Sequence, residues 1–374
     1  MRVVFACAGT GGHVNPAIAI ANIIKRKDKN AQILFIGTET GLENKLVKNA
    51  GYEIRHISTG KIIRSITLKN INAITKNLKG IKEAKNILKE FNPDLVIGTG
   101  GYICGPVMIA ARKFKIPYVL HESNAFPGVT IKLLAKKAAK VMIGFEDARA
   151  RLKNRENIIY TGTPAKFNEE TFEALDKNTC KKELNLLDIN KKIILVTCGS
   201  QGARKINTVV LDMVKKYLNE DIYIILVSGD KNYNDVVSQK ETIEEELKKK
   251  LDNFVRVEKF VYDMDKMYKS VDLCITRSGA MTITELALAG KPSILIPLPT
   301  AAENHQLYNA KVLGDVGAAT IIEQKYLNED TLNDAIFNML NADSLEKMSV
   351  NAKKVKSIDV EEKIYDCVKD SLKK

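Results

Sequence analysis

Two glycine-rich loops, one in each half of the sequence, place polar groups where phosphate chemistry could occur. Residues 9–12 follow the apolar run 3–6 and lead to His13, and residues 199–203 follow the apolar run 193–196. A strand that ends at glycines and opens a helix leaves N–H groups free at the positive helix end, which suits a phosphate or diphosphate. His13 adds a group that can exchange a proton near neutral pH, and Asn15 and Pro16 are expected to open the helix that follows. We therefore expect two nucleotide-type folds facing one cleft.

Polar residues also follow two further predicted strands of the first half. Residues 98–101 are rich in glycine and precede Tyr102, while Glu122 and Asn124 come directly after the next strand. Because parallel strands of one sheet end at the same edge, these residues should meet His13 in one crevice. His13 is our first candidate for a general base and Glu122 is the second. A core histidine and a polar network that only ties loops together are the alternatives.

The second half repeats this arrangement around Ser278 and Gly279. These residues stand between the apolar run 273–275 and an amphipathic helical pattern, and Glu285 lies one to two turns into that helix. Backbone donors at the helix start suit a diphosphate, and a nearby carboxylate can accept hydrogen bonds from both hydroxyls of a ribose. Gln306 begins a later helix at the same edge, where its amide suits sugar hydroxyls. Ordinary capping of helix starts by polar residues is the alternative.

The first loop differs from the dinucleotide-binding fingerprint. Val14 occupies the position of its third glycine, and no Walker A pattern occurs in the chain. A nicotinamide-dependent oxidoreductase is therefore the least favoured interpretation. A non-catalytic nucleotide-binding module is also disfavoured. Such a protein needs only one phosphate-binding loop, whereas this sequence has two such loops and a histidine that are expected to converge.

Apolar, β-branched runs alternate with helix-length stretches through most of the 374 residues. This alternation predicts parallel sheets covered by helices on both faces, and the length suffices for two domains. We place the first domain at residues 1–163 and the second at residues 164–340. Helical patterns in residues 341–374 could pack back on the first domain. The predicted fold class is α/β, with two Rossmann-like parallel-sheet domains.

The formal net charge of +13 favours an anionic partner. Lysine and arginine dominate residues 61–89, where isoleucine and leucine are interleaved with them, and Lys132, Lys136 and Lys140 are spaced as on a second helix. This pattern predicts a surface that rests on an anionic bilayer, with a solvated helix face as the alternative. Nucleic-acid binding is not expected, because no stacking-aromatic motif accompanies the lysines.

The six cysteines are scattered, without a C-x-x-C pair or a histidine at zinc-ligand spacing. We expect reduced, mostly buried thiols, no metal site and no cofactor. The first residues lack a signal-peptide layout, and no apolar run approaches the roughly 18 residues of a membrane span. The protein is expected to be neither secreted nor membrane-spanning.

Taken together and in order, residues 9–16, 100–102, 121–124, 199–203 and 277–285 resemble glycosyltransferase family 28. Any one of these motifs is weak, but all of them in order are specific. The resemblance implies a GT-B fold and an inverting, metal-independent transfer of N-acetylglucosamine from UDP-N-acetylglucosamine to a lipid-linked muramyl-pentapeptide diphosphate. It also implies a peripheral protein at the cytoplasmic face of the cell membrane that works in peptidoglycan synthesis.

The resemblance also implies residue roles, carried over position by position. Val261 stands where the family's backbone binds uracil, Glu285 stands where it binds ribose, and Tyr102 belongs to the acceptor side. Lys166 stands where the family usually has arginine, so the charge is kept but the bidentate fork is lost. The implied donor-binding residues are Thr10, Gly11, Gly12, Asn124, Lys166, Ser200, Val261, Ala280, Met281, Thr282, Ile283, Thr284, Glu285 and Gln306.

Two further functions are compatible with the same fold. Another lipid-directed UDP-sugar glycosyltransferase would share the donor loops and differ in its acceptor, although the loops of His13 and Tyr102 favour the muramyl lipid. A UDP-sugar epimerase would convert the donor with no acceptor present.

Overall fold

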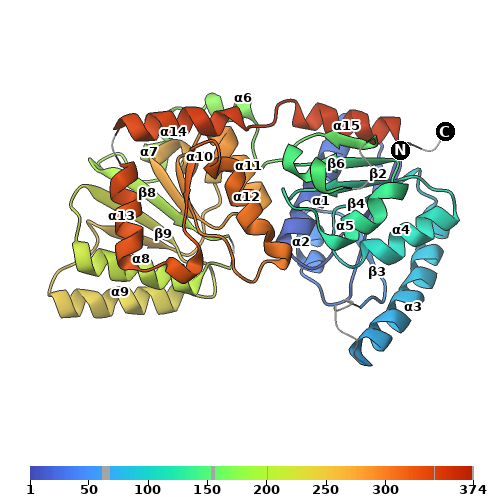
Figure 1. Ribbon diagram of the computed structural model, residues 1–374, viewed down its shortest axis with the longest axis horizontal. Coiled ribbons are helices and arrows are strands. Elements are labelled where there is room, and N and C mark those ends of the chain that lie inside the picture. The colour runs from blue at the N-terminus through green and yellow to red at the C-terminus, as the bar shows by residue number, and fades with distance from the viewer. Residues whose placement is uncertain (61–67, 153–155, 200, 341, 373–374) are drawn as a thin grey trace. The chain divides into compact units, whose positions relative to one another are not determined.

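The computed structural model describes residues 1–60, 68–152, 156–199, 201–340 and 342–372. The chain divides into two compact units (Figure 1). Unit 1 contains Met1–Pro164 together with Ser357–Lys374, and unit 2 contains Ala165–Lys356. Each unit has its own parallel sheet with helices packed against it. The predicted α/β class with two Rossmann-like parallel-sheet domains is confirmed.

Unit 1 is built on a seven-stranded sheet in the order β3-β2-β1-β4-β5-β6-β7. β4 and β5 are buried along their whole length, because they lie in the interior of a sheet covered on both faces. All neighbouring strands pair in parallel, so their carboxyl ends share one edge. The strands are β1 (Arg2–Ala6), β2 (Gln32–Gly37), β3 (Glu53–His56), β4 (Leu95–Gly98), β5 (Tyr118–Glu122), β6 (Lys140–Ile143) and β7 (Ile158–Tyr160).

Helices cover both faces of the unit 1 sheet. One core cluster joins α1 and α15 to the sheet, and a second joins α3, α4 and α5 to its other face. Figure 1 shows α15, the last helix of the chain, within unit 1. The helices are α1 (Gly11–Lys27), α2 (Glu43–Asn49), α3 (Leu68–Phe91), α4 (Cys104–Lys113), α5 (Val129–Leu134) and α15 (Val360–Asp370), with short 3-10 turns η1 (Ala135–Lys137) and η2 (Glu146–Arg151).

Unit 2 is built on a six-stranded sheet in the order β10-β9-β8-β11-β12-β13, again parallel throughout. Its strands are β8 (Lys192–Thr197), β9 (Ile222–Val227), β10 (Val255–Glu258), β11 (Leu273–Thr276), β12 (Ser293–Leu295) and β13 (Ala319–Ile321). Its helices are α6 (Glu169–Glu173), α7 (Lys177–Glu183), α8 (Arg204–Tyr217), α9 (Tyr233–Leu247), α10 (Met264–Ser270), α11 (Ala280–Ala289), α12 (His305–Gly314), α13 (Glu329–Met339) and α14 (Ala342–Lys354), with turns η3 (Ala302–Asn304) and η4 (Gln324–Tyr326).

Two sequence-based expectations need correction. The first helix was expected to open at Asn15 and Pro16, but α1 begins at Gly11, because the carbonyl of Thr10 already accepts hydrogen bonds from the next turn. His13 therefore lies in the first turn of the helix. Lys132, Lys136 and Lys140 do not share a helix, because α5 ends at Leu134 and Lys140 opens β6, where it pairs with Val119 of β5.

Candidate active site

In unit 1, His13 packs against the glycine loop that follows β4. Gly100 has a φ of +114°, which favours glycine, and a Cβ atom there would lie 2.5 Å from His13 Nδ1. The Thr99 hydroxyl donates a hydrogen bond of 2.7 Å to the His13 carbonyl oxygen. Gly101 approaches the carbonyl of Ala8 so closely that a Cβ atom would come within 2.4 Å of its oxygen. The structure thus brings the loops after β1 and β4 together through contacts that only glycine permits.

The start of α1 faces outward from this junction. Thr10 and Gly12 are exposed, Gly11 and His13 are half-buried, and the first N–H groups of any helix lack intrahelical partners. Tyr102 is half-buried and lies just before α4. An anionic group can therefore reach N–H donors and an imidazole at one sheet edge.

Glu122 is buried at the end of β5 and holds the loop that follows it. Its Oε1 accepts hydrogen bonds of 2.9 Å from both the backbone nitrogen and the Nδ2 of Asn124, and its Oε2 accepts one of 2.7 Å from the backbone nitrogen of Gly128. Burial raises the pKa of the Glu122 carboxyl, and these donors oppose that rise. Both oxygens are engaged within the loop, so the geometry suits the positioning of Asn124.

His121, the residue before Glu122, is fully buried. Burial lowers the pKa of its imidazole to about 4. Its ring lies 3.3 Å from both the carbonyl oxygen of Gly162 and the hydroxyl of Ser123. A neutral ring in this position serves the packing of unit 1.

Glu43 was missed by the sequence analysis, yet it reaches the first glycine loop from α2. The side chain is fully buried. Its Oε2 accepts a hydrogen bond of 3.3 Å from the backbone nitrogen of Gly9, and its Oε1 accepts bonds from the nitrogen (2.9 Å) and hydroxyl (2.6 Å) of Thr38. A Cβ atom at Gly41 would lie 2.1 Å from both carboxylate oxygens. An acidic residue in a first helical turn is ordinarily explained by its favourable interaction with the helix dipole. The sequence therefore did not indicate that Glu43 contacts the glycine loop.

In unit 2, the loop after β8 is also shaped by glycine. Gly202 has a φ of +67°, and a Cβ atom there would lie 1.8 Å from the carbonyl oxygen of Ser228. Its nitrogen donates to the carbonyl of Gly199 at 3.0 Å, which closes the turn. Ser200, expected to bind the donor, lies outside the described residues.

The start of α11 is tied to α12. The buried Ser278 hydroxyl donates a hydrogen bond of 2.7 Å to the carbonyl oxygen of Gln306, and Asn309 Nδ2 donates one of 3.1 Å to the carbonyl of Ser278. The Gln306 side-chain oxygen accepts a bond of 2.9 Å from the backbone nitrogen of Leu298. The structure therefore brings Gln306 beside the start of α11.

Residues of α11 differ in what they present to a ligand. Met281 and Thr282 are half-buried in the first turn, whereas Ile283 and Thr284 are buried in the unit. The Thr284 hydroxyl donates to the carbonyl of Ala280 at 3.1 Å. Contact with a ligand at this helix start therefore falls to the first turn and its backbone.

Glu285 lies between Lys166 and Tyr268. The carboxylate is 6% exposed, and its Oε2 accepts a hydrogen bond of 3.3 Å from the Tyr268 hydroxyl. Burial raises the pKa of the Glu285 carboxyl, while the charge of Lys166, the Tyr268 hydroxyl and the Lys166 backbone N–H oppose that rise. The Lys166 side chain is exposed. The structure thus unites two predicted donor-binding residues, Lys166 and Glu285, in unit 2.

Val261 follows β10 and is half-buried. It stands between Phe260 and Tyr262, whose rings meet edge to face with centroids 4.8 Å apart. This places the expected uracil-binding backbone beside two aromatic side chains.

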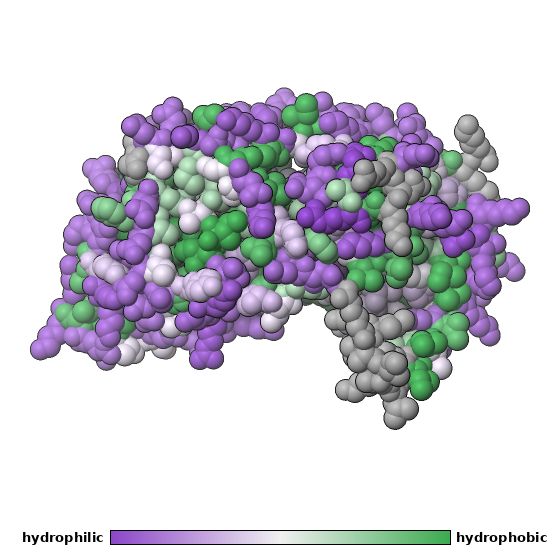
Figure 2. All heavy atoms as spheres, in the orientation of Figure 1, coloured by the Kyte–Doolittle hydropathy of each residue, from purple (hydrophilic) through white to green (hydrophobic). Residues whose placement is uncertain are grey.

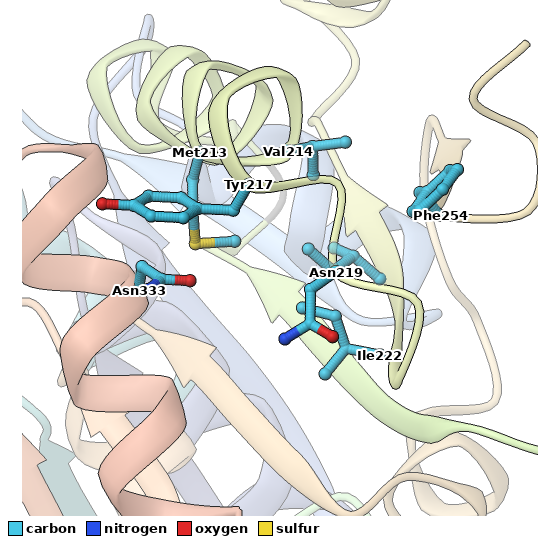
Figure 3. A pocket seen from close by; sticks show the side chains of 8 residues that line it. Met213, Val214, Tyr217, Asn219, Ile222, Phe254 and Asn333 are labelled. Atoms are coloured by element: carbon cyan, nitrogen blue, oxygen red, sulfur yellow. The ribbon is translucent and has the colours of Figure 1, made fainter. Parts of the chain in front are cut away.

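A small cavity elsewhere in unit 2 is unrelated to these residues (Figure 3). It lies among α8, β9 and α13, and residues that line it include Met213, Tyr217, Phe254 and Asn333. Its volume of about 10 Å³ suits a single water molecule. The cavity is therefore too small for a sugar nucleotide. Among the described residues, no group of three or more His, Cys, Asp or Glu side chains could hold a metal ion.

Two parallel-sheet units, each with a glycine-shaped loop at a strand end, define the class of nucleotide-sugar enzymes with the GT-B fold. Residues 3–143 match the glycosyltransferase family 28 N-terminal domain, and residues 193–364 match the glycosyltransferase family 28 C-terminal domain. The chain therefore belongs to glycosyltransferase family 28 and, within it, to the MurG family. The membership predicted from the order of the motifs is confirmed.

Relatives and solved structures agree with this assignment. The UDP-N-acetylglucosamine–N-acetylmuramyl-(pentapeptide) pyrophosphoryl-undecaprenol N-acetylglucosamine transferase of Ruminiclostridium cellulolyticum is 40% identical over 99% of this chain and 100% of its own. The transferase of the same name from Clostridioides difficile is 38% identical over 98% of this chain and 88% of its own. The crystal structure of Acinetobacter baumannii MurG has a TM-score of 0.78 at 29% identity, with 99% of each chain covered.

The solved structure of a Listeria monocytogenes protein described as a putative UDP-N-acetylglucosamine 2-epimerase shares the fold as well. Its TM-score is 0.67 at 15% identity, over 98% of this chain and 95% of that one. At this identity the likeness extends to the fold alone.

Proposed function

We propose that this protein transfers N-acetylglucosamine from UDP-N-acetylglucosamine to the muramyl 4-hydroxyl of undecaprenyl-diphospho-N-acetylmuramyl-pentapeptide, with inversion at the anomeric carbon. The observation that carries the proposal is the 40% identity, over 99% of the chain, to a transferase whose name states this donor and this acceptor. The two glycine-shaped loops and the buried carboxylate of Glu285 supply the chemistry that such a donor needs.

Unit 2 binds the donor in this proposal. The Glu285 carboxylate accepts hydrogen bonds from the ribose hydroxyls, and the backbone at Val261 binds uracil. The first turn of α11 offers N–H groups and the positive end of the helix dipole to the diphosphate. These donors stabilise the charge that grows on the leaving UDP. Lys166 adds a positive charge beside Glu285.

Unit 1 supplies the base. The muramyl oxygen forms a bond to the anomeric carbon while the bond from that carbon to the diphosphate oxygen breaks, and the hydroxyl proton passes to the base. His13 is the first candidate for this role because it is half-buried in the first turn of α1, beside the exposed Thr10 and Gly12. The buried carboxylate of Glu122 is the second candidate. A positioned base contributes roughly 10²–10⁴-fold to the rate.

The anionic membrane surface is assigned to the face of unit 1 formed by α3 and α4. Figure 2 shows apolar surface over α3, where Ile71 is 59% and Leu78 is 62% exposed. Lys76, Lys79 and Lys82 are exposed on the same helix. Residues 61–67, which begin the basic segment in the sequence, lie outside the described residues.

A basic hollow beside α4 supports the same assignment. It has a volume of about 320 Å³ and is lined by Arg112, Lys115 and Lys137 together with Pro117 and Tyr118. None of the three cations forms an ion pair with another described residue. Such a surface suits the phosphates of anionic lipids. None of the described helices is long and apolar enough to cross a bilayer.

The test is a transfer assay with purified protein, radiolabelled UDP-N-acetylglucosamine and the lipid-linked muramyl-pentapeptide diphosphate, in EDTA. We expect label to move into the lipid fraction and UDP to be released in equal amount. A parallel reaction without acceptor detects epimerisation of the donor. Donor binding without transfer would point to another lipid acceptor, and conversion without acceptor would point to an epimerase.

A further inference from the structure

We propose that Tyr268 is a positioning residue of the donor site, whose hydroxyl holds the Glu285 carboxylate in the orientation that accepts the ribose hydroxyls. This inference rests on the proposed function, in which Glu285 binds ribose. It assigns a role to a residue that does not itself contact the donor.

The geometry places Tyr268 directly behind Glu285. Tyr268 lies in α10, is 1% exposed, and donates its hydroxyl to Glu285 Oε2 at 3.3 Å. Burial and the neighbouring carboxylate raise the pKa of Tyr268 well above its usual value, so the hydroxyl keeps its proton and remains a donor. The phenol therefore contributes a hydrogen bond and no charge.

Fixing this carboxylate matters because glutamate has three side-chain torsions and must meet two ribose hydroxyls at once. A carboxylate has about four lone-pair positions. The Tyr268 hydroxyl occupies one of them. The remaining lone pairs of the carboxylate then already point towards the ribose site before the donor binds. Binding therefore costs less side-chain conformational entropy.

Tyr268 is itself held by the segment that begins unit 2. The ring of Phe167 lies 6.1 Å from the ring of Tyr268 and stacks on Phe172 at 5.2 Å. Lys166, whose charge acts on the Glu285 carboxyl, directly precedes Phe167, so one short segment acts on both Glu285 and Tyr268.

The test measures binding of two probes, UDP and 2′,3′-dideoxyuridine diphosphate, to Tyr268→Phe by calorimetry. We expect UDP to bind roughly tenfold more weakly, as for the loss of one hydrogen bond to a charged group. Binding of the dideoxy probe should stay unchanged, because that probe lacks the hydroxyls that Glu285 accepts. At saturating donor, turnover and the acceptor KM should remain those of the wild type.

Tyr223→Phe is the matched control, because Tyr223 is a buried tyrosine of β9 whose hydroxyl forms no hydrogen bond with another described residue. It should bind both probes like the wild type. Weakening of UDP and the dideoxy probe alike in Tyr268→Phe would mean a general distortion of unit 2 and would overturn the inference. Unchanged UDP binding would overturn it as well.

Glu285→Gln separates this inference from the proposed function. If Glu285→Gln leaves UDP binding intact, the ribose role of Glu285 fails, and the inference about Tyr268 fails with it. If Glu285→Gln weakens UDP but Tyr268→Phe does not, only the inference fails. In the double variant the tyrosine substitution should add no further loss, since the two residues act through one contact. Equal melting temperatures of the variants confirm that folded proteins are compared.

Discussion

The imidazole of His13 lies against Gly100, so close that a Cβ atom on that glycine would come within 2.5 Å of Nδ1. Gly100→Ala should therefore displace the ring and strain a backbone whose φ is +114°. We expect turnover to fall at least tenfold and stability to fall by about 1–3 kcal/mol. Steady-state kinetics and urea unfolding check this.

Gly105→Ala provides the comparison for Gly100→Ala. Gly105 lies in α4, and a Cβ atom there would meet nothing within 4 Å. Its variant should retain full activity, and UDP binding should be unchanged in both proteins. Equal activity of the two variants would argue against a catalytic position for His13.

His13→Ala tests the base directly. Loss of a positioned base should lower turnover by roughly 10²–10⁴-fold. Affinity for UDP-N-acetylglucosamine should stay within about twofold, because the proposed contacts to uracil, ribose and diphosphate lie in unit 2. Rapid-quench turnover and equilibrium binding measure the two quantities separately. Equal losses in both would make His13 a donor-binding residue, and His56→Ala, at an exposed histidine, should affect neither.

Glu43→Gln tests whether the buried carboxylate holds the first glycine loop. Glutamine has the same size but only one side-chain oxygen. If that oxygen accepts from Thr38, the NH₂ group faces the N–H of Gly9, and if it accepts from Gly9, the NH₂ group faces Thr38. An unsatisfied buried donor costs about 1–3 kcal/mol of unfolding free energy. We expect that loss together with reduced turnover and unchanged UDP affinity. Reduced stability with wild-type turnover in the folded protein would limit Glu43 to a role in folding.

Donor affinity should depend on the ionisation of Glu285. Burial raises the pKa of this carboxyl, so it takes up a proton at higher pH than an exposed glutamate. The protonated form loses an acceptor for the ribose, and UDP affinity should fall as the pH falls through the raised pKa. The free energy of unfolding should instead rise as the pH falls through this range, because protonation removes a buried charge from the folded protein. Calorimetric titrations against pH should show the loss in the wild type and not in Glu285→Gln.

The membrane proposal predicts that charge reversal on α3 releases the protein from anionic vesicles. Each surface lysine contributes about 1 kcal/mol, so changing Lys76, Lys79 and Lys82 to glutamate should weaken binding at least a hundredfold. Sedimentation with phosphatidylglycerol vesicles measures this, and phosphatidylcholine vesicles give the baseline. Reversal of the exposed lysines Lys248, Lys325 and Lys347 in unit 2 should have far less effect. Unaltered binding of the α3 variant would contradict the assignment.

The sequence predicted the features that short-range patterns encode. Parallel strands that are buried on both faces have continuous apolar sequences. The sequence therefore predicted the cores of β1, β4, β8 and β11 and the loops at their carboxyl ends. The start of α1 was misplaced, because Pro16 suits a first helical turn but is tolerated inside this helix.

Glu43 and Tyr268 could not be predicted as site residues. Their partners, Gly9 and Glu285, lie on other elements and meet them only through tertiary packing. A lone acidic or aromatic residue at helical spacing has an ordinary structural explanation. Only the folded chain distinguishes these residues from the many that have no further role.

Because α15 packs in the core of unit 1, a segment made after unit 2 completes a unit begun before unit 2. Ile364, Cys367 and Val368 share a core cluster with β1 and α1. During synthesis, the face of unit 1 that α15 covers stays exposed until all of unit 2 has emerged from the ribosome. Unit 2 is continuous in sequence and can fold without that delay. The order of folding should therefore run opposite to the order of synthesis.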